Sequence, residues 1–188
     1  MARLKRMEHR TAEELGAALA DIGESPATEG TVELIVRRPS VDEREVLEAG
    51  LLDLDEGLVG DSWRPRGNRH TPDGSANLEA QLTLMNARAA AAIAGSRERW
   101  PLAGDQLYVD LDLGVDNLPA GTRLSVGEAV VEVTPEPHTG CAKFSARFGS
   151  EALKFVNKPP GRDLRLRGVN ARVVTPGAVL VGDAITKL

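Results

Sequence analysis

Apolar and polar residues alternate over several short segments of this chain, and glycine or proline separates most of these segments. Thr31–Arg37 is rich in β-branched residues and ends before Pro39, while Leu107–Leu113 alternates apolar residues with Tyr108 and two aspartates. Both patterns are typical of strands, and the second predicts a strand with one polar, solvated face. The same criteria predict further strands over residues 46–54, 78–85, 122–126, 129–134, 164–174 and 179–185.

Helical patterns are few and short. The segment Thr11–Ile22 begins with a capping box, Thr-Ala-Glu-Glu, and continues with three apolar residues on one face. An alanine run predicts a helix over 86–94, and the phenylalanines of 142–157 predict another, which Gly149 can break. Many short strands with few helices predict a mainly β fold, a closed or partly closed antiparallel barrel with a few short helices.

The chain divides into two predicted regions. Residues 1–28 form an N-terminal helical extension that lies outside the barrel, and residues 29–188 form the barrel domain. Within the barrel domain, Trp63–Asn77 has several prolines and glycines and few apolar side chains, so we expect a long, mobile loop. Loops of this length inside a domain usually serve a function, and we expect this one to cover the site.

Charge and composition narrow the classes of protein. The net charge of −5 argues against a general nucleic-acid surface, because phosphate binding needs clustered Lys and Arg. The apolar run Ala89–Ala94 is too short to span a bilayer, and the acidic residues that follow the basic segment Met1–Arg10 do not resemble a signal peptide. A single cysteine excludes an intramolecular disulfide and fits a reducing compartment. We therefore expect a cytoplasmic protein that binds neither nucleic acid nor membrane.

The single cysteine, Cys141, is the most informative residue for chemistry. It lies between a proline-rich loop and a predicted helix, and Lys143 and Arg147 follow it closely. A helix start and nearby cations favour the thiolate, which is the form that acts as nucleophile and metal ligand. Gly140 allows another molecule to approach the backbone closely. The alternative is a small, buried apolar residue, which is the commonest role of a lone cysteine.

Segments of the chain resemble, in the same order, motifs of one known family. Pro135–Asn157, with the sequence PEPHTGCAKFSARFGSEALKFVN, is similar to the cysteine segment of MOSC domains. EGTVELIVRRP and GLVGDSW resemble the opening strand and the Gly-Asp element of that family, with Asp61 as the aspartate. LPAGTRLSVGEAVVEVT resembles its hairpin, and LRLRGVNARVVTPGAVLVGDAI resembles its closing strands. The resemblance extends over Glu29–Ile185.

The resemblance implies a β-barrel-like fold and a role in carrying sulfur or holding molybdenum cofactor. It gives that role to Cys141, as the catalytic residue and the molybdenum ligand, with Lys143, Arg167 and Arg172 supplying positive charge to the cofactor. The implied partners are a pterin-molybdenum cofactor or a sulfur-donor protein. The implied chemistry is either sulfur transfer, through a persulfide, or a reaction that depends on the molybdenum cofactor.

This chain departs from the family pattern in three respects. Many MOSC proteins have a proline immediately before the cysteine, where this chain has Gly140. An aminotransferase-like lyase domain is missing, so no covalently bound pyridoxal phosphate is expected in this chain. The N-terminal barrel module of the amidoxime-reducing branch is missing as well. The chain therefore resembles a small, stand-alone, bacterial-type member.

Two further polar residues have a structural and a chemical interpretation. His138 is a candidate base or second metal ligand for Cys141, although one Cys and one His fall far short of a four-ligand zinc site. Asp61 is expected to stabilise the turn after Gly60 rather than to act on a ligand.

Basic residues near the C-terminus are candidates for cofactor binding, because a guanidinium pairs with phosphate in a bidentate way. They are Arg162, Arg165, Arg167 and Arg172. In an alternating strand over 164–174, however, Arg165 and Arg167 share one face, and such a face is more often solvated.

Two hypotheses of different classes follow. In the first, the protein is a cytoplasmic MOSC protein whose Cys141 thiolate carries a persulfide or binds molybdenum in a cofactor. In the alternative, it is a non-catalytic β-barrel binding module in which Cys141 is a structural core residue and the pocket recognises a partner or a small anion.

Overall fold

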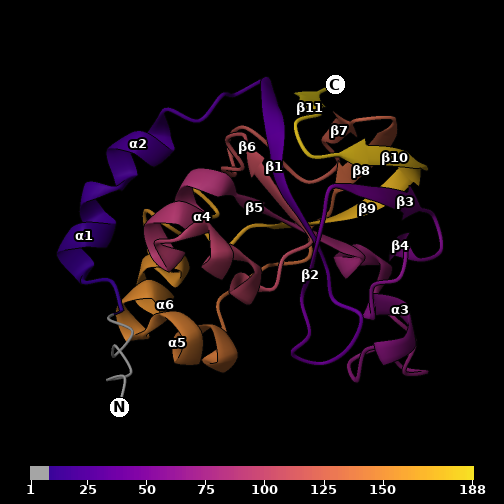
Figure 1. Ribbon diagram of the computed structural model, residues 1–188, viewed down its shortest axis with the longest axis horizontal. Coiled ribbons are helices and arrows are strands. Elements are labelled where there is room, and N and C mark those ends of the chain that lie inside the picture. Colours follow the sequence, from indigo (N-terminus) through magenta and orange to yellow (C-terminus); the bar gives the residue numbers. More distant parts are fainter. Residues whose placement is uncertain (1–8) are drawn as a thin grey trace, which may run out of the picture.

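Seven strands of this chain close into a barrel. The computed structural model describes residues 9–188, and the basic segment 1–8 lies outside the described residues. The ring closes because β1 pairs with β6 on one side and with β11 on the other. The predicted mainly β, barrel-like fold is confirmed (Figure 1). The order around the ring is β1 (Glu29–Arg37), β6 (Leu107–Asp110), β5 (Leu82–Asn86), β9 (Val169–Thr175), β8 (Ala129–Val133), β7 (Arg123–Val126) and β11 (Ala184–Lys187).

The barrel is mixed rather than antiparallel. Strands β5 and β6 are parallel, and each of the other neighbours in the ring is antiparallel. A parallel pair needs a long crossover, and the helix α4 (Ala87–Ala94) and the 3-10 helix η2 (Arg97–Ala103) supply it. Strand β2 (Glu45–Leu47) extends the barrel sheet beside β1. A second, three-stranded sheet consists of β10 (Gly177–Leu180), β3 (Ala49–Asp53) and β4 (Gly57–Leu58).

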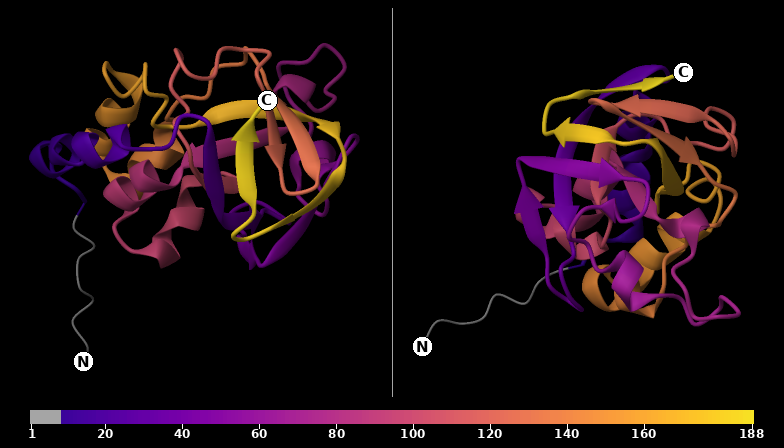
Figure 2. Two further views of the ribbon diagram at one scale, coloured as in Figure 1. Left: turned by 90° about the horizontal axis from the view of Figure 1, so that it is seen from above. Right: turned by 90° about the vertical axis from the view of Figure 1, so that its right-hand side faces the viewer.

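Two apolar cores lie on the two sides of β1, β5 and β6. Leu and Val side chains such as Leu84 and Val109 fill the barrel. A second core, which includes Met85, Tyr108 and Phe144, lies between these strands and the helices. Figure 2 shows this helical layer beside the barrel. It consists of α1 (Ala12–Ala17), α2 (Leu19–Gly23), α4, η2, α5 (Ala142–Phe148) and α6 (Ser150–Asn157).

The prediction of a solvated face on the strand that begins at Leu107 is wrong. Tyr108 is fully buried in the helical layer, and its hydroxyl donates to the carbonyl of Trp100 over 2.6 Å. Helix α4 covers this face of the strand. When both faces of a strand are buried, the alternation of apolar and polar residues does not indicate which face contacts solvent. The regular strand also ends earlier than predicted, at Asp110.

The N-terminal helix forms as its capping box predicts. The backbone N–H of Glu14 donates to the Thr11 hydroxyl over 3.2 Å, and the Thr11 N–H donates to the Glu14 carboxylate over 2.8 Å. The helix is interrupted at Ala18, so it forms the two short helices α1 and α2. Leu15 and Ile22 are buried in the helical layer. The division of the chain at residue 28 stays a prediction.

Several predicted boundaries change for local reasons. The predicted loop 63–77 begins with one helical turn, α3 (Trp63–Arg66), in which Trp63 is buried. The predicted strand 78–85 starts as a 3-10 helix, η1 (Leu78–Ala80), before β5. The predicted strand 164–174 is wrong over its first residues, since β9 begins only at Val169. Residues 160–167 form turns in which Arg165 has a positive φ of 48°.

Replacing Leu15 by Ala tests whether α1 belongs to the core. Leu15 is 1% exposed, so its loss should lower the free energy of unfolding by about 2–5 kcal/mol. Leu54→Ala is the matched control, because Leu54 is 51% exposed and its loss should cost less than about 0.5 kcal/mol. Urea denaturation of both variants measures the difference. Equal, small effects would show that α1 contributes nothing to the core.

Candidate functional site

Cys141 lies where the loop after β8 meets the start of α5. Its backbone is extended (φ −120°, ψ −178°), and it is the N-cap residue of α5, whose C-cap is Gly149. The side chain is exposed and forms no disulfide. The predicted position at a helix start is confirmed. In the alternative hypothesis the Cys141 side chain is packed in the core, and this position is wrong.

The surroundings of the thiol favour its ionised form. Burial raises the pKa of Cys141, but the backbone N–H groups of Phe144 and Lys143, together with the charges of Arg167 and Arg147, lower it by more. The net pKa therefore lies below its ordinary value, and a larger fraction of the thiol is thiolate at neutral pH.

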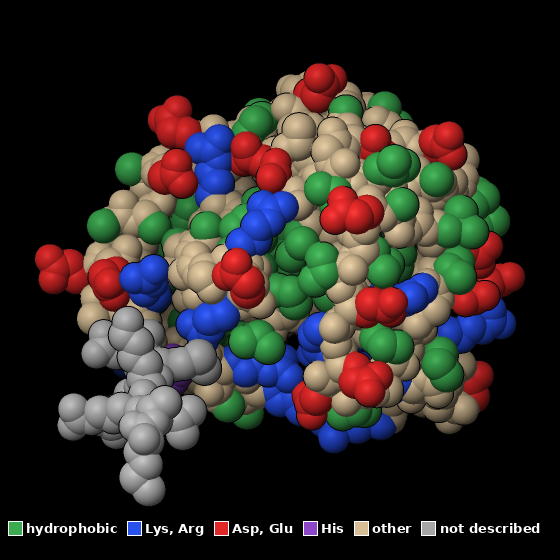
Figure 3. All heavy atoms as spheres, in the orientation of Figure 1, with side chains coloured by type: hydrophobic (Ala, Val, Ile, Leu, Met, Phe, Trp, Pro, Cys, Tyr) green, Lys and Arg blue, Asp and Glu red, His purple; other side chains and the backbone are tan. Residues whose placement is uncertain are grey.

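The thiol opens into a cavity of about 270 Å³ with a strongly basic lining. The cations come from four parts of the chain: the segment after β1, the end of α3, helix α5 and the turn before β9. In Figure 3, Lys and Arg side chains gather on the lower part of the displayed face, beside a hollow. The basic side chains that line the cavity are Arg38, Arg44, Arg66, Lys143, Arg147 and Arg167.

Carboxylates neutralise only part of this charge. Asp61 pairs with Arg38 at 2.8 Å, Asp105 with Arg167 at 2.6 Å, and Asp42 with Arg147 at 2.9 Å. Because a chain of net charge −5 concentrates unbalanced cations here, the cavity attracts anions.

Arg44 and Arg66 carry most of the unbalanced charge. Arg44 donates to the backbone carbonyls of Pro101 and Glu43 instead of to a carboxylate. Burial lowers the pKa of Arg44, and the charges of neighbouring arginines lower it further. Burial and the charge of Arg38 lower the pKa of Arg66 in the same way. An anion in the cavity would offset the repulsion that Arg38 exerts on both guanidinium groups.

Arg167 connects the cavity to the core beneath it. Its guanidinium donates to the fully buried Asp105 and to the carbonyl of Ala103, and it lies 5.1 Å from the centre of the Phe144 ring. Arg167 therefore fixes the first turn of α5 from below, in addition to lowering the pKa of the thiol.

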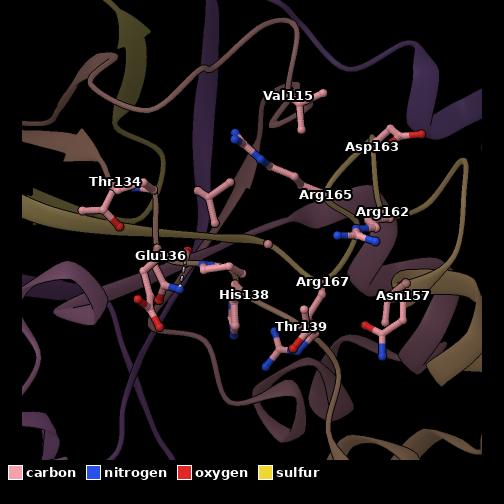
Figure 4. Close-up of a pocket in the computed structure, with 16 residues that line it drawn as sticks. Val115, Thr134, Glu136, His138, Thr139, Asn157, Arg162, Asp163, Arg165 and Arg167 are labelled. Atoms are coloured by element: carbon pink, nitrogen blue, oxygen red, sulfur yellow. Dashed lines mark hydrogen bonds between the residues drawn. The ribbon is translucent and has the colours of Figure 1, made fainter. Parts of the chain in front are cut away.

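Arg167 also lines a second, larger cavity of about 550 Å³, whose lining includes His138, Thr139 and Asn157. In Figure 4, His138, Thr139 and Arg167 lie together at one end of it, while Arg162 and Arg165 extend from the segment after α6. Cys141 does not line this cavity, and His138 does not line the basic one. His138 and the Cys141 thiol, which the sequence suggested as partners, therefore line different cavities.

His138 is neutral in this environment. Burial and the charge of Arg167 lower the pKa of His138 to about 3, although the Asp105 carboxylate opposes them. Its Nδ1 lies 3.5 Å from Asp105 Oδ1, too far for a good hydrogen bond. An imidazole with such a low pKa is a weak base at neutral pH.

Asp61 stabilises the turn after Gly60, as the sequence suggests, and it also binds Arg38. Its carboxylate accepts from the backbone N–H of Trp63, at the start of α3, and of Arg38, each over 2.9 Å. It also forms a bidentate pair with the Arg38 guanidinium. Asp61 thus holds Arg38 at the basic cavity.

The structure brings three of the four predicted site residues together. Cys141, Lys143 and Arg167 line the basic cavity, although the Lys143 side chain is 67% exposed and lies 3.9 Å from Asp42. Arg172 does not line it, because its guanidinium lies on β9 and pairs with Glu132 at 2.7 Å. Arg165 is held by the backbone carbonyls of Leu113 and Leu118.

Sequence reasoning missed the arginines from outside the cysteine segment: Arg38, Arg44 and Arg66. Each lies in or beside an irregular segment, and tertiary contacts alone bring them to Cys141. The one local signal is the pair Arg37–Arg38 before Pro39, where a strand ends in two cations.

Residues 72–186 match the sequence model of the MOSC domain. The chain belongs to the MOSC family. No curated protein matches the sequence significantly. The chain is similar in structure to the YuaD protein from Bacillus subtilis, with a TM-score of 0.63 and 17% identity over 84% of this chain and 94% of that chain. It is also similar to YiiM from Escherichia coli, with a TM-score of 0.53 and 17% identity over 84% and 69% of the two chains. These structures support the MOSC-type fold.

Residues 9–188 of this MOSC protein contain neither a cluster of metal-binding side chains nor a membrane-spanning helix. No group of three or more His, Cys, Asp or Glu side chains in that range could hold a metal ion. No helix there has the length and apolar character to cross a membrane.

The basic cavity predicts that Cys141 prefers anionic reagents. Relative to glutathione, Cys141 should react faster with iodoacetate than with iodoacetamide at low salt, because only iodoacetate is charged. Arg66→Gln should lower this ratio about fivefold, the effect of about 1 kcal/mol from one partly solvated charge. Arg172→Gln removes the same charge outside the cavity and is the control. A wild-type ratio equal to that of glutathione would contradict the account.

The Asp105–Arg167 pair predicts a large effect on stability. Asp105→Asn leaves the Arg167 charge buried without its partner, so the free energy of unfolding should fall by about 3–5 kcal/mol. Asp42→Asn is the control, because Asp42 is exposed and its pair with Arg147 should contribute less than about 1 kcal/mol. Guanidinium denaturation compares the two variants. A loss below about 1 kcal/mol for Asp105→Asn would contradict this role.

Proposed function

We propose that this MOSC protein uses the Cys141 thiolate to carry sulfur or to bind the molybdenum of a cofactor, and that it does so in the cytoplasm. The observation that carries the proposal is an exposed thiol of lowered pKa inside a cavity with unbalanced cations. Thiolate sulfur is soft, which suits both persulfide chemistry and molybdenum. A single cysteine stays a free thiol in a reducing compartment.

The residues of the cavity fit a molybdenum cofactor by the chemistry of their donors. Cys141 offers the sulfur ligand, and Arg44, Arg66, Lys143 and Arg167 offer positive charge to the anionic part of a pterin cofactor. Within the described residues, Arg167 also has a buried N–H group, at Nε, without a partner. The cofactor, when bound, would supply two-electron redox chemistry. In this assignment the arginines orient the anionic group, and the helix start keeps the proton off Cys141.

Sulfur transfer would use the same groups without a metal. The Cys141 thiolate attacks the outer sulfur of a donor persulfide, a new S–S bond forms at Cys141, and the donor leaves as its thiolate. This exchange is redox-neutral and needs no other reactant. The cations of the cavity would stabilise the negative charge of both the incoming persulfide and the product persulfide on Cys141.

The alternative is that the barrel only binds an anion. The basic cavity favours it, because anion binding needs nothing beyond the guanidinium groups. It gives no reason, however, for a thiolate at the opening of the same cavity. The two hypotheses differ in what Cys141 should carry.

Protein purified from its own host separates the two hypotheses. Intact-mass spectrometry should detect added sulfur on Cys141, or elemental analysis should detect co-purified molybdenum. Cys141→Ser, which keeps the size of the side chain, should fold normally and lose both. Wild-type protein that carries neither sulfur nor molybdenum, yet binds phosphate or sulfate as tightly as Cys141→Ser does, would support the anion-binding alternative.

A further inference from the structure

One side chain holds the backbone that leads into Cys141. Asn157 is the last residue of α6, and its amide forms two hydrogen bonds to Gly140. The Gly140 N–H donates to Asn157 Oδ1 over 2.8 Å, and Asn157 Nδ2 donates to the Gly140 carbonyl over 3.0 Å. The N–H belongs to the peptide before Gly140 and the carbonyl to the peptide after it. Asn157 therefore fixes the orientation of both peptide planes next to the cysteine.

We call these two hydrogen bonds the Asn157 clamp. The clamp is not a cap of α6, the helix that carries Asn157. The C-cap of α6 is Lys158, whose backbone N–H donates to the carbonyl of Lys154. Both polar atoms of the Asn157 side chain point away from their own helix, to a residue that is 17 positions earlier in the chain. A cap role for the side chain therefore does not account for these contacts.

Gly140 packs closely against α6, so a Cβ at this position would require the side chains of Leu153 and Val156 to shift. A Cβ at this position would lie 2.8 Å from Cδ1 of Leu153 and 3.0 Å from Cγ2 of Val156. Helix α6 is itself anchored, since Ala152 and Val156 are buried in the helical layer. The backbone before the cysteine thus rests on a fixed surface and is held there by two hydrogen bonds.

The clamp bears directly on the thiol. The extended conformation of Cys141 places its side chain at the first turn of α5, facing the basic cavity. Rotation of the peptide between Gly140 and Cys141 would turn the side chain away from that position. We propose that Asn157 is a positioning residue for Cys141, which holds the thiol at the start of α5 by clamping Gly140.

This inference rests on the proposed reactivity of Cys141, and the pH dependence of alkylation tests the two separately. Asn157→Ala removes both hydrogen bonds. Below the wild-type midpoint, its rate with iodoacetamide should fall about tenfold, which corresponds to a midpoint about one pH unit higher. The plateau at high pH should change less than twofold, because the fully formed thiolate stays exposed.

Asn117→Ala is the matched control. The Asn117 amide also donates to two backbone carbonyls, those of Ala27 and Asp112, and it does not line the basic cavity. This variant should lose similar stability and keep the wild-type midpoint. A wild-type midpoint in Asn157→Ala would overturn the inference and leave the proposed function intact. A wild-type midpoint equal to that of glutathione would instead contradict the proposed function.

Amide hydrogen exchange in the wild-type protein tests the clamp without a substitution, in case Asn157→Ala does not fold. Gly140 has no regular secondary structure, and among residues 9–188 its N–H donates to Asn157. We expect exchange at least tenfold slower than in an unstructured peptide. Exchange at the unprotected rate would overturn the inference.

Discussion

The buried ion pair between Arg167 and Asp105 ties the barrel to the cysteine helix. Asp105 lies two residues before β6, and Arg167 lies two residues before β9. The guanidinium also packs against Phe144 in the first turn of α5. A buried charge without its partner is strongly destabilising, so this pair fixes where the start of α5 can lie relative to the barrel. The position of Cys141, and the two cavities that Arg167 lines, depend on that constraint.

The rigid support of the fold and the residues of the site come from different parts of the chain. Strands β1, β5 and β6 are buried on both faces, which gives a rigid support for the helical layer. Residues that carry the chemistry lie instead on the connections, at the end of β1, in α3 and in the loop after β8. Rigid strands with functional residues on their connections are common among binding proteins and enzymes. Gly140 belongs to this arrangement, because a proline there would lack the N–H group that Asn157 binds.

Local patterns predicted the parts of the molecule that local interactions determine. The capping box at Thr11, the hairpin of β7 and β8, and the start of α5 at Cys141 each follow from a few neighbouring residues. Arg167 was predicted to lie near Cys141, and it does, but the predicted strand is wrong at this residue, since turns orient its side chain. Arg44 and Arg66 could not be predicted, because only the closed fold brings them to the thiol. Their charge is also hidden in a sequence whose net charge is negative.

The ultraviolet absorbance of the thiolate during a pH titration measures the pKa of Cys141 directly. Cys141 is the only cysteine, and the only tyrosine, Tyr108, is buried with a raised pKa, so its phenolate does not interfere near neutral pH. The spectrum of Cys141→Ser gives the baseline. We expect a midpoint clearly below the ordinary value of about 8.5, and the midpoint should rise as added salt screens the arginines. A midpoint at or above the ordinary value, unaffected by salt, would contradict this expectation.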